Sequence, residues 1–309
     1  MMWAFIFIFM FAAFIAACIY LITRVRKFVW VDKLAKDRKW LSILISAAIC
    51  VVFIVVLSLA MGYINAIIVT IYMILFWLVC EFAFRLVGKV KNRTKSTADE
   101  TTKNNTIKNN AESSVKPKKR KIYYAGVAAI IITIVYMSWG WYQAHNVWQK
   151  DYTIQTDKVV GSIKLALIAD SHTGITFDGD GFAEHVKEIQ GQDLSEVMDR
   201  GGSRADIEDL VKALDDDKYQ IVMDHQPADY AHEKAAGVDL VLSGHTHGGQ
   251  MLLMKIFQEI TGMGGNDQIY GLKDLDGSDF LVTSGISDWA IKFKTGCRSE
   301  YVIIDIRGK

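Results

Sequence analysis

The sequence predicts an α/β chain in which a multi-pass helical membrane bundle precedes a mixed α/β domain. Two observations support this prediction. The long apolar runs of the 309-residue chain all lie before residue 143. In residues 151–309, by contrast, short apolar runs alternate with stretches of helical spacing, which is typical of helices packed on sheets.

Four apolar runs predict transmembrane helices, because each is close to the length of about 20 residues that a helix needs to cross a bilayer. No basic residue precedes Trp3, as a cleaved signal peptide would require, so the first run is expected to be retained. We expect three transmembrane helices in residues 1–87 and a fourth in residues 122–142. The runs cover Trp3–Ile22, Leu41–Met61, Ile64–Leu86 and Ile122–Tyr142.

Basic residues predict the orientation of this bundle. Residues 24–40 hold seven Lys and Arg against two Asp, and residues 88–121 end in a second basic cluster. Short loops rich in Lys and Arg stay in the cytoplasm. The prediction is therefore a multi-pass protein of the cell membrane whose residues after Tyr142 are extracytoplasmic. Residues 88–121 have hardly any large apolar side chains, which predicts a basic, disordered cytoplasmic linker. Its basic clusters could equally rest on anionic lipid.

Charge and cysteine usage exclude several classes of protein. The formal net charge is +1, and basic loops are segregated from a more acidic domain, so nothing favours nucleic-acid binding. Cys297 is the one cysteine after residue 143, which excludes a disulfide framework there. Glu81 and Arg85 lie four residues apart at the cytoplasmic end of the third run, where they could pair or snorkel. The apolar runs make the lipid bilayer the first expected partner.

The α/β domain is expected to begin with an edge strand or linker in residues 151–160. Two helices are expected at Phe182–Gln190 and Ser203–Leu214, the second opened by a capping box, and a short third helix at Ala228–Ala236. Buried strands are expected at Ile163–Ala169, Ile221–Met223, Val238–Leu242, Phe280–Thr283 and Tyr301–Ile306.

Three of these strands end in potential metal ligands. Asp170 and His172 follow the first strand, His225 the second, and His245 and His247 the third, within a glycine-rich loop. Each alone could be a capping aspartate or a hydrogen-bonded histidine. Because all five follow buried strands, where open α/β sheets place their ligands, we expect them to converge on one metal site.

These motifs, strand-Asp-x-His, His-x-Pro and Gly-His-Thr-His-Gly-Gly-Gln, resemble the calcineurin-like metallophosphoesterases, and in particular their membrane-anchored bacterial branch. The resemblance covers residues 160–306. It implies an αββα sandwich of two mixed sheets, and hydrolysis of phosphate esters at two divalent metal ions such as manganese or iron. By motif, Asp170, His172 and His247 resemble ligands of the first ion, and His225 and His245 ligands of the second.

The sequence departs from the family pattern in its centre. The family's metal-bridging aspartate in a Gly-Asp, and its Gly-Asn-His with the leaving-group histidine, have no match, so no catalytic residue is assigned. Gly179–Asp180 and Val197–Gly201 are interpreted as loop residues, and Gly265–Asp267 comes in the wrong order. No apolar strand follows Gln190, so we infer a truncated domain that lacks a central segment at the Gln190–Gly191 junction.

Asp170 is then the sole carboxylate among the five predicted ligands. One carboxylate is not enough to offset the repulsion between two divalent metal ions. Asp170, His172 and His247 could hold one ion as a two-histidine, one-carboxylate face. The sequence favours a membrane-anchored phosphoesterase with impaired activity, whose substrate is a phosphorylated small molecule or lipid, including lipid-linked pyrophosphates. The alternative is a non-catalytic remnant that binds one metal ion or none.

Further polar residues have less definite expectations. Ser284–Ser287 either borders the site or serves only packing, and three cations could meet a substrate phosphate or form a solvated face. Two further histidines, each on a predicted helix, are expected to be exposed. The cations are Lys292, Lys294 and Arg298, and the histidines are His185 and His232.

Overall fold

The computed structural model describes residues 15–102, 122–172, 174, 179–190, 207–212, 214 and 217–308. The chain divides into two compact units between Val135 and Tyr136, and each unit is considered by itself. The division falls inside one helix, α5 (Tyr124–His145), so the end of that helix belongs to the second unit.

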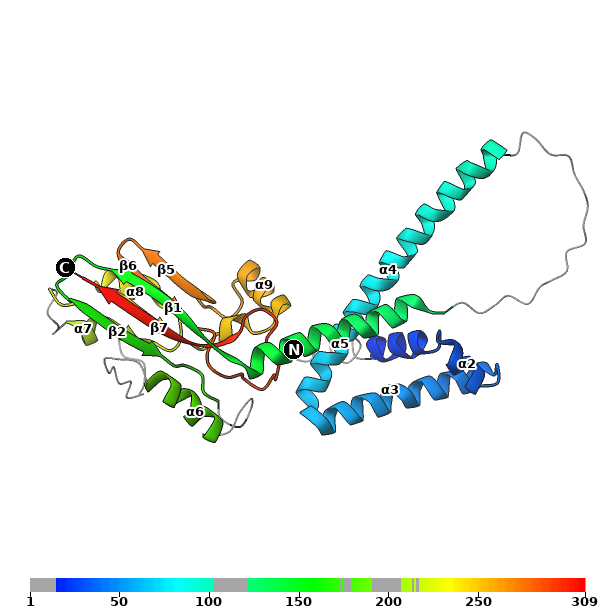
Figure 1. The fold of residues 1–309 in the computed structure, drawn as a ribbon, viewed down its shortest axis with the longest axis horizontal. Helices are drawn as coiled ribbons and strands as arrows, with labels where there is room; N and C mark the ends of the chain where they lie inside the picture. Colours follow the sequence, from blue (N-terminus) through cyan, green and yellow to red (C-terminus); the bar gives the residue numbers. More distant parts are fainter. Residues whose placement is uncertain are drawn as a thin grey trace, which may run out of the picture. The chain divides into compact units, whose positions relative to one another are not determined.

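The first unit is helical (Figure 1). Among the described residues, three helices are long and apolar enough to cross a membrane, and they contain most of the second, third and fourth predicted runs. Of the first run, the described part forms a helix at Ile15–Val25, while residues 3–14 lie outside the described residues. Two of the three long helices are α3 (Lys39–Met61) and α4 (Tyr63–Thr102), the third is α5, and the short helix α2 (Val29–Leu34) precedes α3. Since α4 continues to Thr102, it passes residue 88, where the linker was expected to begin; residues 103–121 lie outside the described residues.

Glu81 on α4 is a buried carboxylate with several charged partners in the first unit. Its buried carboxylate accepts hydrogen bonds from Lys27 at 2.6 Å and from Arg24 at 3.0 Å. Arg85 pairs with it at 3.1 Å, as the spacing of four residues allows, and Tyr123 also donates to it. A buried carboxylate is tolerable where cations and hydroxyls replace its water, so this cluster joins three segments of the helical unit.

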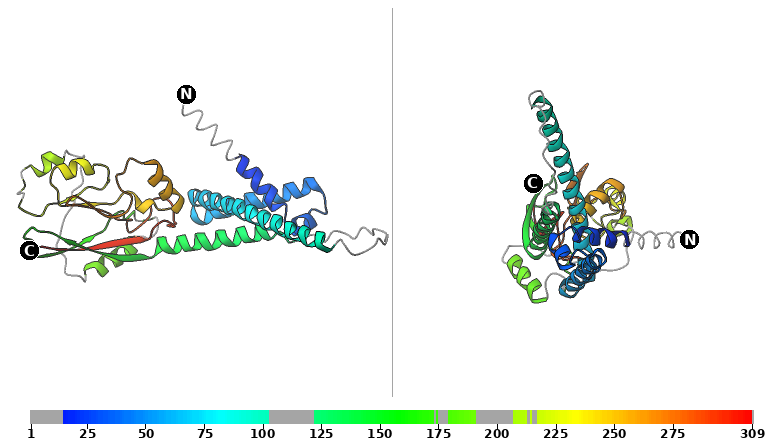
Figure 2. Two further views of the ribbon diagram at one scale, coloured as in Figure 1. Left: turned by 90° about the horizontal axis from the view of Figure 1, so that it is seen from above. Right: turned by 90° about the vertical axis from the view of Figure 1, so that its right-hand side faces the viewer.

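The second unit is built on two sheets, which lie in separate layers (Figure 2). The first has the order β1-β7-β2: β1 (Val147–Gln155) runs parallel to β7 (Ser299–Arg307), and β2 (Ser162–Leu167) runs antiparallel to it. The second has the order β3-β4-β6-β5. In it β3 (Ile221–Met223), β4 (Leu240–Ser243) and β6 (Ser278–Val282) are parallel, and β5 (Gly271–Leu275) is antiparallel to β6.

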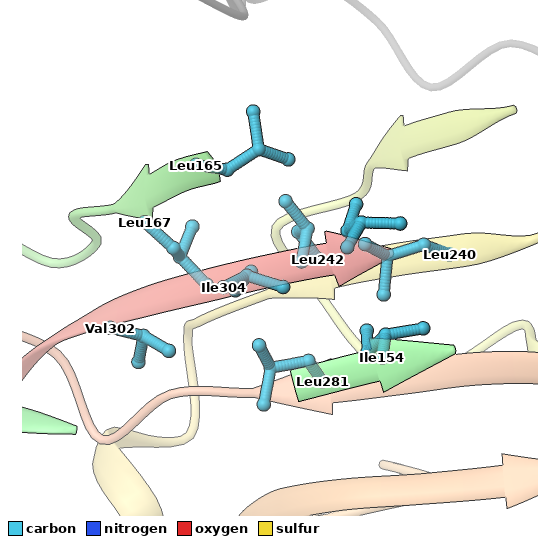
Figure 3. Packing of buried hydrophobic residues seen from close by; sticks show 9 residues of the cluster. Ile154, Leu165, Leu167, Leu240, Leu242, Leu281, Val302 and Ile304 are labelled. Atoms are coloured by element: carbon cyan, nitrogen blue, oxygen red, sulfur yellow. The ribbon is translucent and has the colours of Figure 1, made fainter. Parts of the chain in front are cut away.

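The hydrophobic core lies between the two sheets (Figure 3). Alternate residues of β2 and β7 face alternate residues of β4, because side chains on a strand alternate between its faces. On β4, the residues of the other set face outward onto α7 (Ile207–Val211) and α8 (Tyr230–Ala235). The buried core residues are Ile154, Leu165, Leu167, Leu240, Leu242, Leu281, Val302, Ile304 and Ile306.

This sandwich of two mixed sheets with helices on the second sheet agrees with the α/β prediction. The expected edge strand is β1, but it begins at Val147 because it pairs with β7 along nine residues. Residues 179–190 form α6 (Gly179–Gln190), so Gly179 and Asp180 lie in the first helical turn and the loop interpretation was wrong. The capping box at 203–206, residues 197–201 and the Gln190–Gly191 junction itself lie outside the fully described residues.

Candidate metal centre

The candidate site lies where strands of both sheets end. Asp170 and His172 come shortly after β2, His225 follows β3, and His245 and His247 follow β4. Each position is therefore set by a strand in the core, while the side chains extend from loops. The structure brings all five predicted residues to one cavity of about 410 Å³.

Backbone strain is concentrated at these residues. Asp170, His172, His245 and His247 have φ angles of 55°, 31°, 64° and 50°. Residues with a Cβ atom rarely adopt positive φ, and such strained positions persist where the surroundings hold them and cluster at functional sites. The loops thus hold these four side chains in conformations that local sequence preference does not favour.

Asp170 is the centre of the cluster. Its side chain is 1% exposed, and its Oδ1 atom lies 3.4 Å from Nε2 of His225. The same oxygen lies 3.7 Å from Nε2 of both His172 and His247. The other carboxylate oxygen, Oδ2, accepts a hydrogen bond of 3.0 Å from the backbone N–H of His245. One carboxylate therefore faces three imidazoles and is oriented by the backbone of the fifth residue.

Asp170, His172 and His247 form a possible metal-binding triad, with one ligand atom from each lying within 4.8 Å of the others. His225 and His245 lie together on the same cavity, their ring centroids 5.6 Å apart. Two imidazoles and a carboxylate are ligands that divalent transition metals accept, so the donor set fits such an ion.

Burial lowers the pKa of His247 to about 4, an effect that nearby Lys294 reinforces and Asp170 opposes. The imidazole is therefore neutral near pH 7, and a neutral imidazole has the free lone pair that a metal ligand needs. Its Nδ1 lies 3.3 Å from the backbone oxygen of Ser287, which fixes the ring and directs Nε2 toward Asp170.

The buried segment Ser284–Asp288 packs against the candidate ligands. Ile286 and Ser287 donate backbone hydrogen bonds to the carbonyls of Ala169 and Asp170, at 2.9 and 3.2 Å. The segment was expected either to border the site or to serve packing. It does both, since it is buried and also contacts the candidate ligands.

Lys294 holds this segment in turn. Its ammonium group donates to the carbonyls of Ser284 at 2.9 Å and Gly285 at 3.1 Å, and it lies 3.6 Å from Asp288 Oδ1. Its side chain is fully buried, so both expectations for Lys294, a substrate-facing cation and a solvated face, were wrong. His232 is exposed as expected, whereas His185 is half-buried.

Two glycines allow the loops to approach Asp170. A Cβ on Gly244 would lie 2.6 Å from Asp170 Oδ2, and a Cβ on Gly285 would lie 2.7 Å from Asp170 Cβ. Real Cβ atoms do not approach other atoms so closely, so glycine is required at both positions.

Several residues of the cavity wall were not predicted. Asn266, Gln258, Met254 and Trp289 all line the cavity, and three of them come from α9 (Leu252–Thr261) or the turn after it. The side-chain oxygens of Asn266 and Gln258 are buried, with no hydrogen-bond partner among the described residues. Among the described residues that line the cavity, Asp170 is the only carboxylate.

Comparisons with known proteins bear on this site. Neither a family model nor a solved structure matches the chain. An uncharacterized metallophosphoesterase of Campylobacter jejuni is 34% identical over 117 residues, which are 36% of this chain and 29% of that protein. One from Aquifex aeolicus is 32% identical, covering 33% and 38% of the two chains, and one from Helicobacter pylori is 33% identical, covering 34% and 28%.

The chain thus spans less than two fifths of the length of each of these relatives. Their names agree with the resemblance carried by the Asp-x-His and Gly-His-Thr-His motifs, and the structure has a possible metal-binding triad at those motifs. The chain is therefore similar to proteins named as metallophosphoesterases over about a third of its own length.

Proposed function

We propose that this protein is a membrane-anchored, metal-dependent phosphoesterase. The observation that carries the proposal is the convergence of Asp170, His172 and His247, with His225 and His245 on the same cavity. The metallophosphoesterase relatives support the reaction class, and the three long apolar helices support the anchor.

The proposed roles follow from the contacts of each side chain. Asp170, His172 and His247 would hold a divalent ion, and His225 and His245 would serve a second ion or the phosphoryl oxygens. When bound, such an ion polarises the phosphoryl group and lowers the pKa of a coordinated water. The hydrogen bond from His245 N–H to Asp170 keeps the carboxylate in place, and the neutral state of His247 leaves its lone pair available.

The substrate is proposed to be a phosphate ester or a lipid-linked pyrophosphate at the outer face of the membrane. The basic residues in 24–40 and 88–121 support this orientation, because they favour a cytoplasmic position for both loops. The helix α5 then leads directly into β1, so the α/β domain would begin at the membrane surface.

The activity of this copy is proposed to be impaired. Among the described residues, only one carboxylate lines the cavity, and β2 and β3 are both edge strands of their sheets. Both observations fit the loss of a central segment that would have supplied strands and ligands. The same observations favour a second candidate, a non-catalytic remnant that binds one metal ion or none.

Metal analysis separates the two candidates. The full chain is purified in detergent, loaded with Mn²⁺ or Fe²⁺, and assayed for bound metal and for turnover of a generic phosphodiester. If the protein is an enzyme, it binds metal and turns over the diester, and His247→Ala loses both properties. His232→Ala is the control and should retain both, because the ring of His232 is exposed and bonds to Asp229. If the chain binds less than one metal ion and shows no turnover, the non-catalytic remnant is the correct candidate.

Sequencing the gene across codons 190 and 191 tests the proposed gap. A longer reading frame at this junction would restore the missing central segment and the ordinary enzyme. An unchanged frame would mean that the chain itself lacks the segment, and the metal analysis above then applies to its natural form.

A further inference from the structure

The helix α9 has an apolar face that the described part of the chain does not cover. Its apolar side chains recur at helical spacing on one side, and none of its residues is buried. Ile260 is 78% exposed and Phe257 is 50% exposed. This apolar face of α9 consists of Leu252, Leu253, Ile256, Phe257 and Ile260.

The other side of α9 is held by the domain. A Cβ on Gly249 would lie 2.6 Å from Cβ of Lys255, so the loop of the metal centre packs closely on this side of the helix. Lys255 also lies over the ring of Tyr270, 5.3 Å from its centroid. Gly262 ends the helix with φ of 64° and a hydrogen bond to Gln258. The apolar face is therefore turned away from the domain by contacts on the opposite side.

One hydroxyl group connects the start of α9 with α5. Thr295 Oγ1 accepts a hydrogen bond of 3.1 Å from the backbone N–H of Leu252, the first residue of α9. Tyr136 on α5 donates to the same oxygen at 2.9 Å. The following turns of α5 are joined to the same segment, since Lys294 N–H donates to Gly140 and Ser299 donates to Ala144, both at 2.9 Å.

This connection sets the depth of α9 relative to a bilayer. The helix α5 has 22 residues, and a helix needs about 20 to cross the hydrocarbon core, so nearly all of α5 is required for a span. Tyr136 lies nine residues before its end at His145, which is about 14 Å along the axis. If α5 spans the membrane, the start of α9 lies at the level of the outer leaflet.

The geometry points to a membrane contact: the apolar face of α9 docks on the lipid leaflet that α5 enters. Trp289, which is 63% exposed, also lines the metal cavity, as does Met254 of α9. Exposed Trp139, Trp141 and Tyr142 occupy the last turns of α5, and aromatic rings prefer the headgroup layer. The cavity would thus open at the level of lipid phosphates.

Lipid is favoured over other occupants because the apolar face of α9 lies beside the end of α5, the helix proposed to span the membrane. A surface for a protein partner or a second copy would have no need to lie beside the end of an apolar helix. An amphipathic helix at the interface buries its apolar side chains among acyl chains, and the stabilisation grows with the apolar area buried. The inference rests on the membrane anchoring of the proposed function, but it requires neither bound metal nor turnover.

Photo-cross-linking tests the docking. The photoreactive residue p-benzoylphenylalanine is placed separately at Phe257 and Ile260 of the full chain, in vesicles of phosphatidylcholine and phosphatidylglycerol. Val52 on α3 serves as the positive control for membrane insertion, and Val159, exposed between β1 and β2, as the negative control. After irradiation, lipid adducts are measured by mass spectrometry.

We expect lipid adducts at Phe257 and Ile260 several-fold above those at Val159. Adducts at Val52 with only background yield at Phe257 and Ile260 would overturn the docking while leaving the anchor intact. Cross-linked dimers of the chain at these positions would assign the apolar face to a second copy and also overturn it. Background yield at Val52 as well would refute the anchor itself, and with it the inference.

A second measurement links the docking to the site without altering the cavity. Ile260→Asp is expected to lower turnover of a phosphate ester embedded in vesicles several-fold and to leave a water-soluble ester unaffected, since Ile260 does not line the cavity. In a chain whose unaltered form turns over both esters, equal effects on both, or on neither, would contradict a role for the apolar face in reaching lipid substrate.

Discussion

Asp170 determines what the site can do at the scale of single residues. It is one acidic group among four histidines, and its two oxygens already have distinct neighbours. Because His247 is neutral near pH 7, the carboxylate supplies the negative charge of the triad. A single divalent ion is the charge that this arrangement offsets best, since two close cations repel strongly without a second carboxylate.

Gly244→Ala tests how closely the loops must approach Asp170. The added Cβ would lie 2.6 Å from Asp170 Oδ2, so the carboxylate or the His245 loop must move. We expect Mn²⁺ affinity, measured by isothermal titration, to fall about 10- to 100-fold, as when groups that orient metal ligands are lost. Gly179→Ala is the matched control, because its Cβ would meet nothing within 4 Å. Unchanged affinity in Gly244→Ala would argue against Asp170 as a ligand.

At the scale of elements, the segment Ser284–Asp288 is as important as the strands. It bonds to the backbone of Asp170 and to the ring of His247, and Lys294 bonds to two of its carbonyls. A buried ammonium group is stable only with such partners. The segment is thus a link between β6, which precedes it, and the candidate ligands.

Lys294→Met should therefore destabilise the second unit. Removing one partner of a buried ion pair costs about 3–5 kcal/mol, because the other charge stays buried. Asp288→Leu in addition should recover part of this loss. Thermal unfolding of the detergent-solubilised chain, followed by near-ultraviolet circular dichroism, measures both effects. Lys273→Met on β5, where the side chain is exposed, should have little effect. Equal melting temperatures for both single variants would exclude the structural role.

The sequence predicted the strands of the core because their apolar residues form short, distinct runs, as in Val238–Leu242. It did not predict β5, where Lys273 and Asp274 interrupt the pattern and pairing with β6 supplies the stabilisation. The helix α9 has a helical spacing and a terminal glycine in its sequence, so that signal was present and was missed.

The candidate ligands could be predicted from the sequence because each follows a strand. The other residues of the cavity wall could not be predicted. Asn266 and Trp289 lie in loops whose positions depend on the folded chain, and no local pattern marks them. Lys294 was assigned wrongly for a similar reason. A lysine has no sequence signal for burial, and the burial of Lys294 depends on carbonyls that folding brings near it.

At the scale of the whole molecule, the orientation in the membrane remains a prediction. Alkaline phosphatase fused after Lys309 should be active, because it folds only outside the cytoplasm, whereas a green fluorescent protein fused there should be dark. Fusions within residues 103–121 should give the reverse pattern. An active phosphatase at the internal position and an inactive one after Lys309 would invert the topology and exclude substrates of the outer leaflet.

The edge position of β2 and β3 has a consequence for the handling of this protein. In the described part of the chain, each has one side with backbone N–H and C=O groups that no strand of the unit pairs. Such edges are templates for adding a strand from another molecule. Concentrated samples are therefore expected to associate through these strand edges.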